Sequence, residues 1–324
     1  MKVTDVLMLT PVFKEMIWGG SRMRKEFGYD IPGDDTGECW AVSAHKNGDC
    51  TISGGAFDGQ TLSAVWNAEP KLFGGHKEGE PFPLLTKIID ARQNLSIQVH
   101  PDDEYAKVHE NGSLGKTECW YILDCDSDAT IIIGHNAKNK AELTDMIRGG
   151  RFSEFIREIP IKKGDFLQIY PGTVHAIKGG TMILETQQNS DITYRVYDYD
   201  RLQNGRKREL HVEQSIDVIT VPFEGSEAKD KGEPLTVKKG SCECLPMIRC
   251  QYYEVWKIKN MSAVTLLQDR DFLICSVIEG EGRLKDSEEG SIAIKKGDHF
   301  IIPNGFGEFT LEGEVELICS SAVR

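Results

Sequence analysis

The chain has 324 residues, of which 40% are hydrophobic and 27% are charged, a composition typical of soluble globular proteins. Its formal net charge of −13 at pH 7 argues against nucleic acid as a partner, because phosphate backbones are bound by surfaces dense in Lys and Arg. No stretch approaches the ~18 consecutive apolar residues of a membrane-spanning helix, so we expect no membrane association.

The N-terminus and the cysteines predict a cytoplasmic location. Residues 1–20 contain no long apolar run and no cleavage site of a secretory signal. The nine cysteines are scattered singly, apart from Cys242 and Cys244, and none forms a CxxC pair. Such an odd and unpatterned set is typical of reduced thiols rather than of a disulfide framework.

Strand patterns dominate the first 200 residues. They predict strands over residues 11–20, 37–45, 84–90, 95–100, 117–124, 129–134, 166–171, 174–177, 181–187 and 192–197. Helical spacing and helix-start signals predict short helices over 61–73 and 102–110, two more within 139–157, and one near 213–217.

A polar, turn-rich segment at 222–234 predicts a linker between two domains. Beyond it, the chain shows strand patterns almost without helical ones, over 235–237, 252–258, 263–267, 272–279, 291–294, 298–302 and 315–319. We therefore expect a larger domain over residues 1–225 and a smaller all-β domain over 226–324.

Two segments of the chain resemble each other, at residues 161–175 and 294–308. Each has basic residues, a Gly-Asp turn, an apolar strand, and then Pro and Gly at the next turn. This pattern resembles the second sequence motif of cupin barrels. It predicts a mainly β protein with a cupin-type (jelly-roll) barrel, short helices and a second, cupin-like C-terminal domain. Only the first copy keeps its histidine, His175, so we expect metal ligands in the first domain alone.

A polar face along the predicted strand 95–100 indicates a pocket. Ser96, Gln98 and His100 alternate with Ile97 and Val99, so the three polar side chains share one face. A metal-ligand type, a neutral oxygen donor and a small hydroxyl are suited to lining a cavity rather than to facing solvent.

Other strands supply groups that can converge on this face. Lys116 and Glu118 share a face of the next strand, His175 follows a Pro-Gly turn, and Glu185 faces inward later. Two imidazoles and one carboxylate with an open position suit zinc or another divalent ion. Burying Glu118 unpaired would cost several kcal/mol, and a metal ion would remove that cost. Taken singly, a histidine is more often part of a satisfied core, and we expect that of the six other histidines.

Arg195 alternates with apolar residues in the predicted strand 192–197. An arginine in such a strand requires an anion, either a substrate phosphate or carboxylate or a structural partner. Asp198 and Asp200 are both close enough in sequence to be that partner. Both interpretations remain open from the residues alone.

The chain resembles class I mannose-6-phosphate isomerases (phosphomannose isomerases), in their short bacterial form. The resemblance rests on residues 18–20, 37–43, 95–103, 115–121, 171–176 and 190–198. The most specific parts are Q-V-H-P-D-D, which begins at Gln98, and K-T-E-C-W-Y, which begins at Lys116.

The resemblance implies a zinc-dependent aldose–ketose isomerase that interconverts mannose 6-phosphate and fructose 6-phosphate through an enediol(ate). It implies one Zn²⁺ per chain, bound by a set of four ligands: Gln98, His100, Glu118 and His175. It also implies that Arg195 is catalytic and that Ser96 and Lys116 hold the phosphate end. Glu185 or a metal-linked water would move the proton, while Lys116 and Arg195 handle negative charge.

Two other functions remain open. One is a different metal-cupin enzyme, such as an Fe or Mn dioxygenase or another sugar-phosphate isomerase. The other is a sugar-binding cupin without turnover, since the second domain shows that this architecture survives without ligands. We expect a small phosphorylated sugar as the binding partner and a monomer or weak homo-oligomer.

Overall fold

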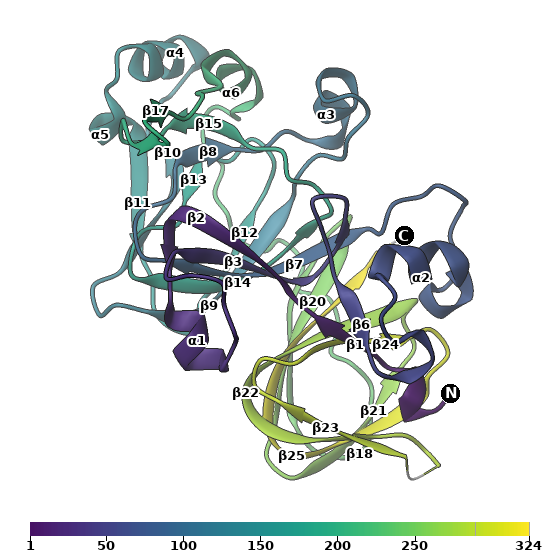
Figure 1. The fold of residues 1–324 in the computed structure, drawn as a ribbon. Helices are drawn as coiled ribbons and strands as arrows, with labels where there is room; N and C mark the ends of the chain where they lie inside the picture. Colours follow the sequence, from purple (N-terminus) through teal and green to yellow (C-terminus); the bar gives the residue numbers. More distant parts are fainter. Residues whose placement is uncertain (289, 324) are drawn as a thin grey trace.

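The computed structural model describes residues 1–288 and 290–323, and antiparallel β-sheet dominates it (Figure 1). This confirms the predicted mainly β fold. The upper part of the molecule carries several short helices, while the lower part is a sheet that curls round on itself (Figure 1). No helix among these residues is long and apolar enough to span a membrane.

The upper part contains two antiparallel sheets. The first runs in the order β12 (Phe166–Ile169), β9 (Glu118–Cys125), β14 (Thr181–Gln188), β7 (Leu84–Ala91), β2 (Val12–Gly20) and β3 (Thr36–Val42). The second runs in the order β11 (Ile156–Pro160), β10 (Thr130–His135), β13 (His175–Ala176), β8 (Ile97–Val99) and β15 (Tyr194–Tyr197). One buried cluster joins their inner faces, with Trp120 and Ile183 from the first sheet and Ile131 and Ile133 from the second. Such packing of two sheets forms the jelly roll.

The lower part is a single ten-stranded sheet. Its main path is β18 (Val237–Gly240), β21 (Ala263–Gln268), β25 (Gly307–Ala322), β22 (Phe272–Lys285), β24 (His299–Pro303), β1 (Leu7–Thr10) and β6 (Thr51–Ser53). Three further strands pair beside it: β19 (Glu243–Arg249), β20 (Tyr253–Asn260) and β23 (Ser291–Lys295). The sheet thus takes two strands from the start of the chain. The division of the chain at residues 225 and 226 stays a prediction.

The helices are short and lie around the sheets. They are η1 (Val3–Asp5), α1 (Arg22–Phe27), η2 (Gly55–Phe57), α2 (Leu62–Ala68), η3 (Pro70–Phe73), α3 (Asp103–His109), α4 (Lys140–Arg148), α5 (Phe152–Phe155) and α6 (Val212–Val218). Two small hairpins complete the set: β4 (Ala44–His45) with β5 (Gly48–Asp49), and β16 (Leu202–Gln203) with β17 (Arg206–Lys207). Side-chain caps explain two of the helix starts, because Asp102 and Asn139 each accept a bond from a backbone N–H of the first turn.

Several elements were not predicted from the sequence. They are β1, α1, β6, β11, β19 and the hairpin of β16 and β17. The predicted helical region 139–157 contains α4 and α5, but its last two residues begin β11. Ile156 and Ile159 of that strand pack on the core while the residues between them are exposed, so tertiary contact decides its state.

His299 is a buried histidine that links segments distant in sequence. Its lowered pKa leads us to expect that the stability of the fold depends on pH. Its Nδ1 lies 2.9 Å from the Ser276 hydroxyl, its Nε2 lies 2.8 Å from the Tyr29 hydroxyl, and burial lowers its pKa to about 3. The folded protein therefore keeps this imidazole neutral, whereas the unfolded chain protonates it below about pH 6.5. As the pH falls from about 6.5 towards 3, this residue alone should cost about 1.4 kcal/mol of unfolding free energy per pH unit.

Urea unfolding at a series of pH values measures that slope. His299→Gln keeps a polar side chain but cannot titrate, so its stability should fall less steeply with acid than that of the wild type. Equal slopes for the two proteins would contradict the prediction.

Candidate metal centre and substrate cavity

A row of polar side chains crosses the second sheet of the upper part. His175 on β13 lies directly opposite Gln98 on β8, and Gln98 lies directly opposite Arg195 on β15. Directly opposed residues in an antiparallel pair project to the same face with their Cβ atoms about 5 Å apart. The register thus brings three residues that are distant in sequence to one wall.

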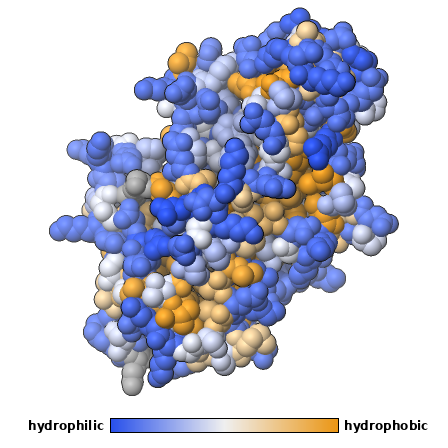
Figure 2. Space-filling view, turned by 180° about the vertical axis from the view of Figure 1, so that it is seen from behind, coloured by the Kyte–Doolittle hydropathy of each residue, from blue (hydrophilic) through white to orange (hydrophobic). Residues whose placement is uncertain are grey.

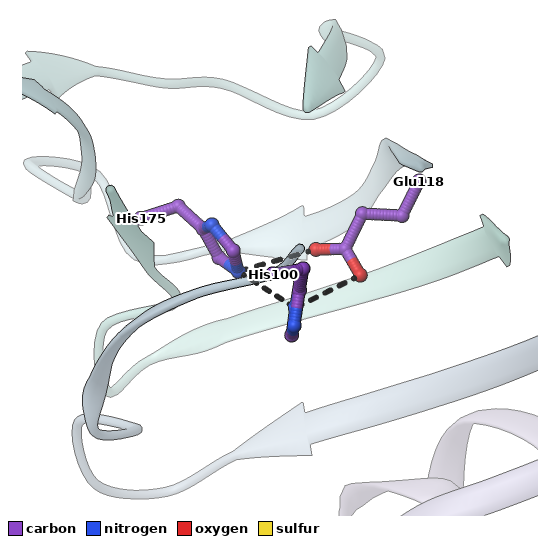
Figure 3. A group of neighbouring side chains, drawn as sticks. All are labelled: His100, Glu118 and His175. Carbon is purple, nitrogen blue, oxygen red and sulfur yellow. Dashed lines mark hydrogen bonds and ion pairs between the residues drawn. The ribbon is translucent and has the colours of Figure 1, made fainter. Parts of the chain in front are cut away.

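His100, Glu118 and His175 converge from three segments of the upper part (Figure 3). The Nε2 atoms of the two histidines are 3.1 Å apart. One Glu118 oxygen lies 3.5 Å from His100 Nε2, and the other lies 3.4 Å from His175 Nε2. All three side chains are almost fully buried. The arrangement is the set of two imidazoles and one carboxylate that the sequence predicts.

Backbone carbonyls orient both imidazoles. His100 Nδ1 donates to the carbonyl of Ile192 at 2.7 Å, and His175 Nδ1 donates to that of Thr173 at 2.9 Å. A carbonyl only accepts, so each Nδ1 carries the proton and each Nε2 presents a lone pair. Burial lowers the pKa of His175 to about 4 and that of His100 well below its usual value, with Lys116 nearby adding to the latter effect. Two lone pairs that face each other at 3.1 Å are suited to binding one cation between them.

Glu118 is a buried carboxylate that has an ion-pair partner but no hydrogen bond. Neither of its oxygens accepts a hydrogen bond of acceptable geometry. The Lys116 ammonium lies 2.6 Å from Oε2 as an ion pair, and 3.2 Å from His100 Nε2. Burial lowers the pKa of Lys116, but the carboxylates of Glu118 and Glu185 outweigh this effect and raise it. The two histidines and Glu118 therefore form a negative, lone-pair-rich centre that fits a divalent metal cofactor.

Glu185 lies beside this centre on β14. Its Oε2 accepts a bond from the Trp120 indole at 2.9 Å, which fixes the carboxylate. Its Oε1 is buried without a hydrogen-bond partner, 3.8 Å from Lys87 Nζ and 3.9 Å from Lys116 Nζ. Burial, together with the charge of Glu118, raises the pKa of Glu185. A carboxylate with a raised pKa and a free oxygen is a candidate proton carrier.

A cavity of about 340 Å³ opens next to the metal centre. Five of the eight predicted site residues line it: Ser96, Gln98, Lys116, Glu185 and Arg195. The three side chains shown in Figure 3 are not part of this lining. Gln98 connects the two regions, because its amide nitrogen is 3.2 Å from His175 Nε2 while its oxygen accepts from Ser96 at 3.3 Å. The structure thus gathers all eight predicted residues around one cavity and one centre.

Arg195 has no structural carboxylate partner among the described residues. Asp198 instead pairs with Arg201 and Arg208, and Asp200 pairs with Lys207. Arg195 Nη1 donates to the Glu209 carbonyl at 3.0 Å, while its buried Nε has no partner. Of the two interpretations left open by the sequence, the structure therefore favours an arginine available for an anionic ligand.

The sequence reasoning missed Lys87 on β7. Its ammonium lies 3.6 Å from Glu38 Oε2 and 5.0 Å from the centre of the Trp40 ring, and it lines the same cavity. Register places Trp40, Lys87, Glu185 and Trp120 side by side across four strands. A lysine within the otherwise packable run Leu84–Ala91, all of whose residues are buried, was the signal that could have identified it.

A larger cavity of about 1120 Å³ lies elsewhere, between the linker at 223–231 and the edge strands β11 and β12. Seen from behind, hydrophobic surface gathers where the upper and lower parts of the molecule meet (Figure 2). None of the eight predicted site residues lines this larger cavity. Size therefore does not identify the functional site, whereas the polar groups of the smaller cavity do.

Comparison with known proteins places this geometry in a family. The family profile described as "Phosphomannose isomerase type I, catalytic domain" matches residues 6–142, and the one described as "Mannose-6-phosphate isomerase, cupin domain" matches residues 245–322. "Mannose-6-phosphate isomerase ManA" of Bacillus subtilis is 52% identical over 98% of this chain and 99% of that protein. This chain belongs to the type I phosphomannose isomerase family.

Other proteins named mannose 6-phosphate isomerase match this chain over nearly its whole length. "Mannose-6-phosphate isomerase" of Streptococcus mutans is 46% identical, with 98% of each chain covered. The crystal structure of mannose 6-phosphate isomerase from Bacillus subtilis matches with a TM-score of 0.91 at 46% identity, covering 97% of this chain and 99% of that one. A zinc-bound mannose 6-phosphate isomerase, at 16% identity and a TM-score of 0.78, shares the fold.

Proposed function

We propose that this protein is a zinc-dependent isomerase that interconverts D-mannose 6-phosphate and D-fructose 6-phosphate. The names and full-length coverage of the relatives support the reaction. One observation carries the proposal for this chain's own residues: two imidazoles whose Nε2 lone pairs face each other beside a buried carboxylate without hydrogen bonds. We further propose that the protein acts in the cytoplasm, as a monomer or weak homo-oligomer.

We assign one Zn²⁺ per chain to His100, His175, Glu118 and Gln98. The first three offer ligand atoms that all lie within 4.8 Å of one another. Gln98 would serve after a half turn of its amide, which would exchange its nitrogen for its oxygen beside His175. Bound zinc would supply positive charge that polarises the carbonyl group of the open-chain sugar.

Glu185 is our candidate for the group that moves the proton between C1 and C2. Trp120 holds one oxygen and leaves the other free towards the cavity. Its raised pKa makes the ionised form a stronger base than an ordinary carboxylate. A water molecule held at the metal is the alternative carrier.

Lys116 and Arg195 would handle negative charge at opposite ends of the substrate. The Lys116 ammonium lies against the metal ligands, so we assign it to the oxygens of the reacting carbons. Arg195 lines the cavity and lacks a carboxylate partner, and Ser96 lies two residues before Gln98 on the same wall. We assign both to the phosphate end, where a guanidinium can bind two oxygens at once. This assignment differs from the one that the resemblance implies, in which Lys116 holds the phosphate end with Ser96 and Arg195 is catalytic.

Removal of metal tests the proposal. Treatment with a chelator should abolish the formation of fructose 6-phosphate from mannose 6-phosphate, because polarisation of the carbonyl depends on the ion. Zinc should restore the rate, as measured by an assay coupled to fructose 6-phosphate with metal content determined in parallel. Restoration by Fe(II) and not by zinc would indicate a different metal-cupin enzyme. If the metal-replete protein forms no product, the remaining interpretation is a sugar-binding cupin without turnover.

A further inference from the structure

The Lys116 ammonium occupies space close to the position that a bound metal ion would take. It is 2.6 Å from Glu118 Oε2 and 3.2 Å from His100 Nε2, two of the atoms assigned to the metal. Zinc binds such atoms at about 2.0–2.2 Å, which places the ion within roughly 3.5 Å of the ammonium at this geometry. Two cations that close in a buried, poorly screened site repel each other strongly.

Glu185 offers the ammonium a second position. Its Oε1 lies 3.9 Å from Lys116 Nζ and is buried without a hydrogen-bond partner. The Trp120 indole fixes the other oxygen, so this acceptor is held in place. The Lys116 backbone is also fixed, because its N–H donates to the Pro101 carbonyl at 3.0 Å. A small rotation of the lysine side chain would therefore exchange one carboxylate partner for the other.

We propose that Lys116 and the metal ion compete for the same ligands, and that metal binding transfers the Lys116 ammonium from Glu118 to Glu185. The transfer frees both Glu118 oxygens for the ion and supplies the hydrogen bond that Glu185 Oε1 lacks. Lys116 and Glu185 both line the substrate cavity, whereas Glu118 does not. Metal binding would thus bring Lys116 and Glu185 together as the ion pair that faces the sugar. Metal binding and the formation of this substrate-facing pair would therefore be coupled. This inference rests on the metal site proposed above.

The test measures zinc affinity rather than turnover. Protein stripped by a chelator is titrated with zinc in competition with a chromophoric chelator. Lys116→Met removes the competing charge and should bind zinc at least about tenfold more tightly than the wild type, within the usual range of coupling between two sites. Zinc should also raise the unfolding temperature of this variant by more than it raises that of the wild type. Lys116→Arg keeps the charge and should show no such gain.

Lys87→Met is the matched control. Lys87 is equally buried and 3.8 Å from the same Glu185 oxygen, and it contacts neither His100 nor Glu118. The Lys87→Met variant loses the same charge from the same cavity, so its zinc affinity should differ from that of the wild type by only about threefold or less. Unchanged or weaker zinc binding in Lys116→Met, or an equal gain in Lys87→Met, would overturn the inference.

One further variant separates this inference from the metal site itself. His100→Gln should bind zinc much more weakly than the wild type. If it binds zinc as tightly, the metal site proposed above is wrong. If it binds weakly while Lys116→Met is unchanged, the site stands and only the exchange of partners is overturned.

Discussion

Glu118→Gln is expected to lose its zinc and to lower kcat/KM by about 10³-fold or more, since an ion that polarises the carbonyl would contribute several kcal/mol of transition-state stabilisation. The substitution preserves shape but removes the negative charge that faces both imidazoles and Lys116. Metal content by atomic spectroscopy and steady-state kinetics with mannose 6-phosphate measure the two effects. Excess zinc should restore only part of the activity.

Glu254→Gln serves as the control for this prediction. Glu254 is also a buried carboxylate with cationic partners, Arg249 and Arg270, but it lies in the lower sheet, far in sequence from the metal ligands. It should lose stability while keeping its zinc and its kcat. If Glu118→Gln retained zinc and turned over at the wild-type rate, Glu118 would not be a ligand.

Glu185→Gln, assayed with excess zinc, should lower kcat by about 10²–10⁴-fold, the usual contribution of a positioned general base, while KM changes little. The amide keeps the size of the side chain and its contact with Trp120 but cannot accept a proton from carbon. Rates with mannose 6-phosphate that carries deuterium at C2 report on the proton transfer itself.

Glu38→Gln removes another carboxylate from the same cavity. Glu38 accepts from the Trp40 indole at 2.6 Å and pairs with Lys87 at 3.6 Å. Its effect on kcat should be much smaller than that of Glu185→Gln, and the isotope effect should persist. Full turnover of the deuterated sugar by Glu185→Gln would assign the proton transfer to a water molecule instead.

The candidate site was largely predictable because strand alternation fixes which side chains share a face. Ser96, Gln98 and His100 could be read in this way, and so could the pair Lys116 and Glu118. Strand alternation does not show which oppositely charged side chain each charged residue contacts. That Lys116 lies against Glu118 and not against Glu185 depends on a difference in position of about one bond length. Lys87 was missed because an isolated lysine on an otherwise mostly apolar strand does not alternate with other polar residues on its face.

The fold was predictable where local patterns decide it and unpredictable where pairing is distant in sequence. The runs that form β7, β9 and β14 carry strong strand patterns, and each was expected within two residues. β1 and β6 are short, and their hydrogen-bond partners lie in other parts of the chain. β19 contains Pro246, which argues against a strand, yet the structure accommodates it where β19 pairs on one side only, with β20.

The pairing of β1 with β24 sets a limit on the order in which the protein can be completed during synthesis. Leu7 lies opposite Ile301, so most of the described chain separates these two partners. The two sheets that hold the candidate metal-binding residues draw every strand from residues 12–197, so all their strands are made before β24. The lower sheet cannot be completed that early. Its strand β1 must wait for β24, which makes this closure a non-local step of folding.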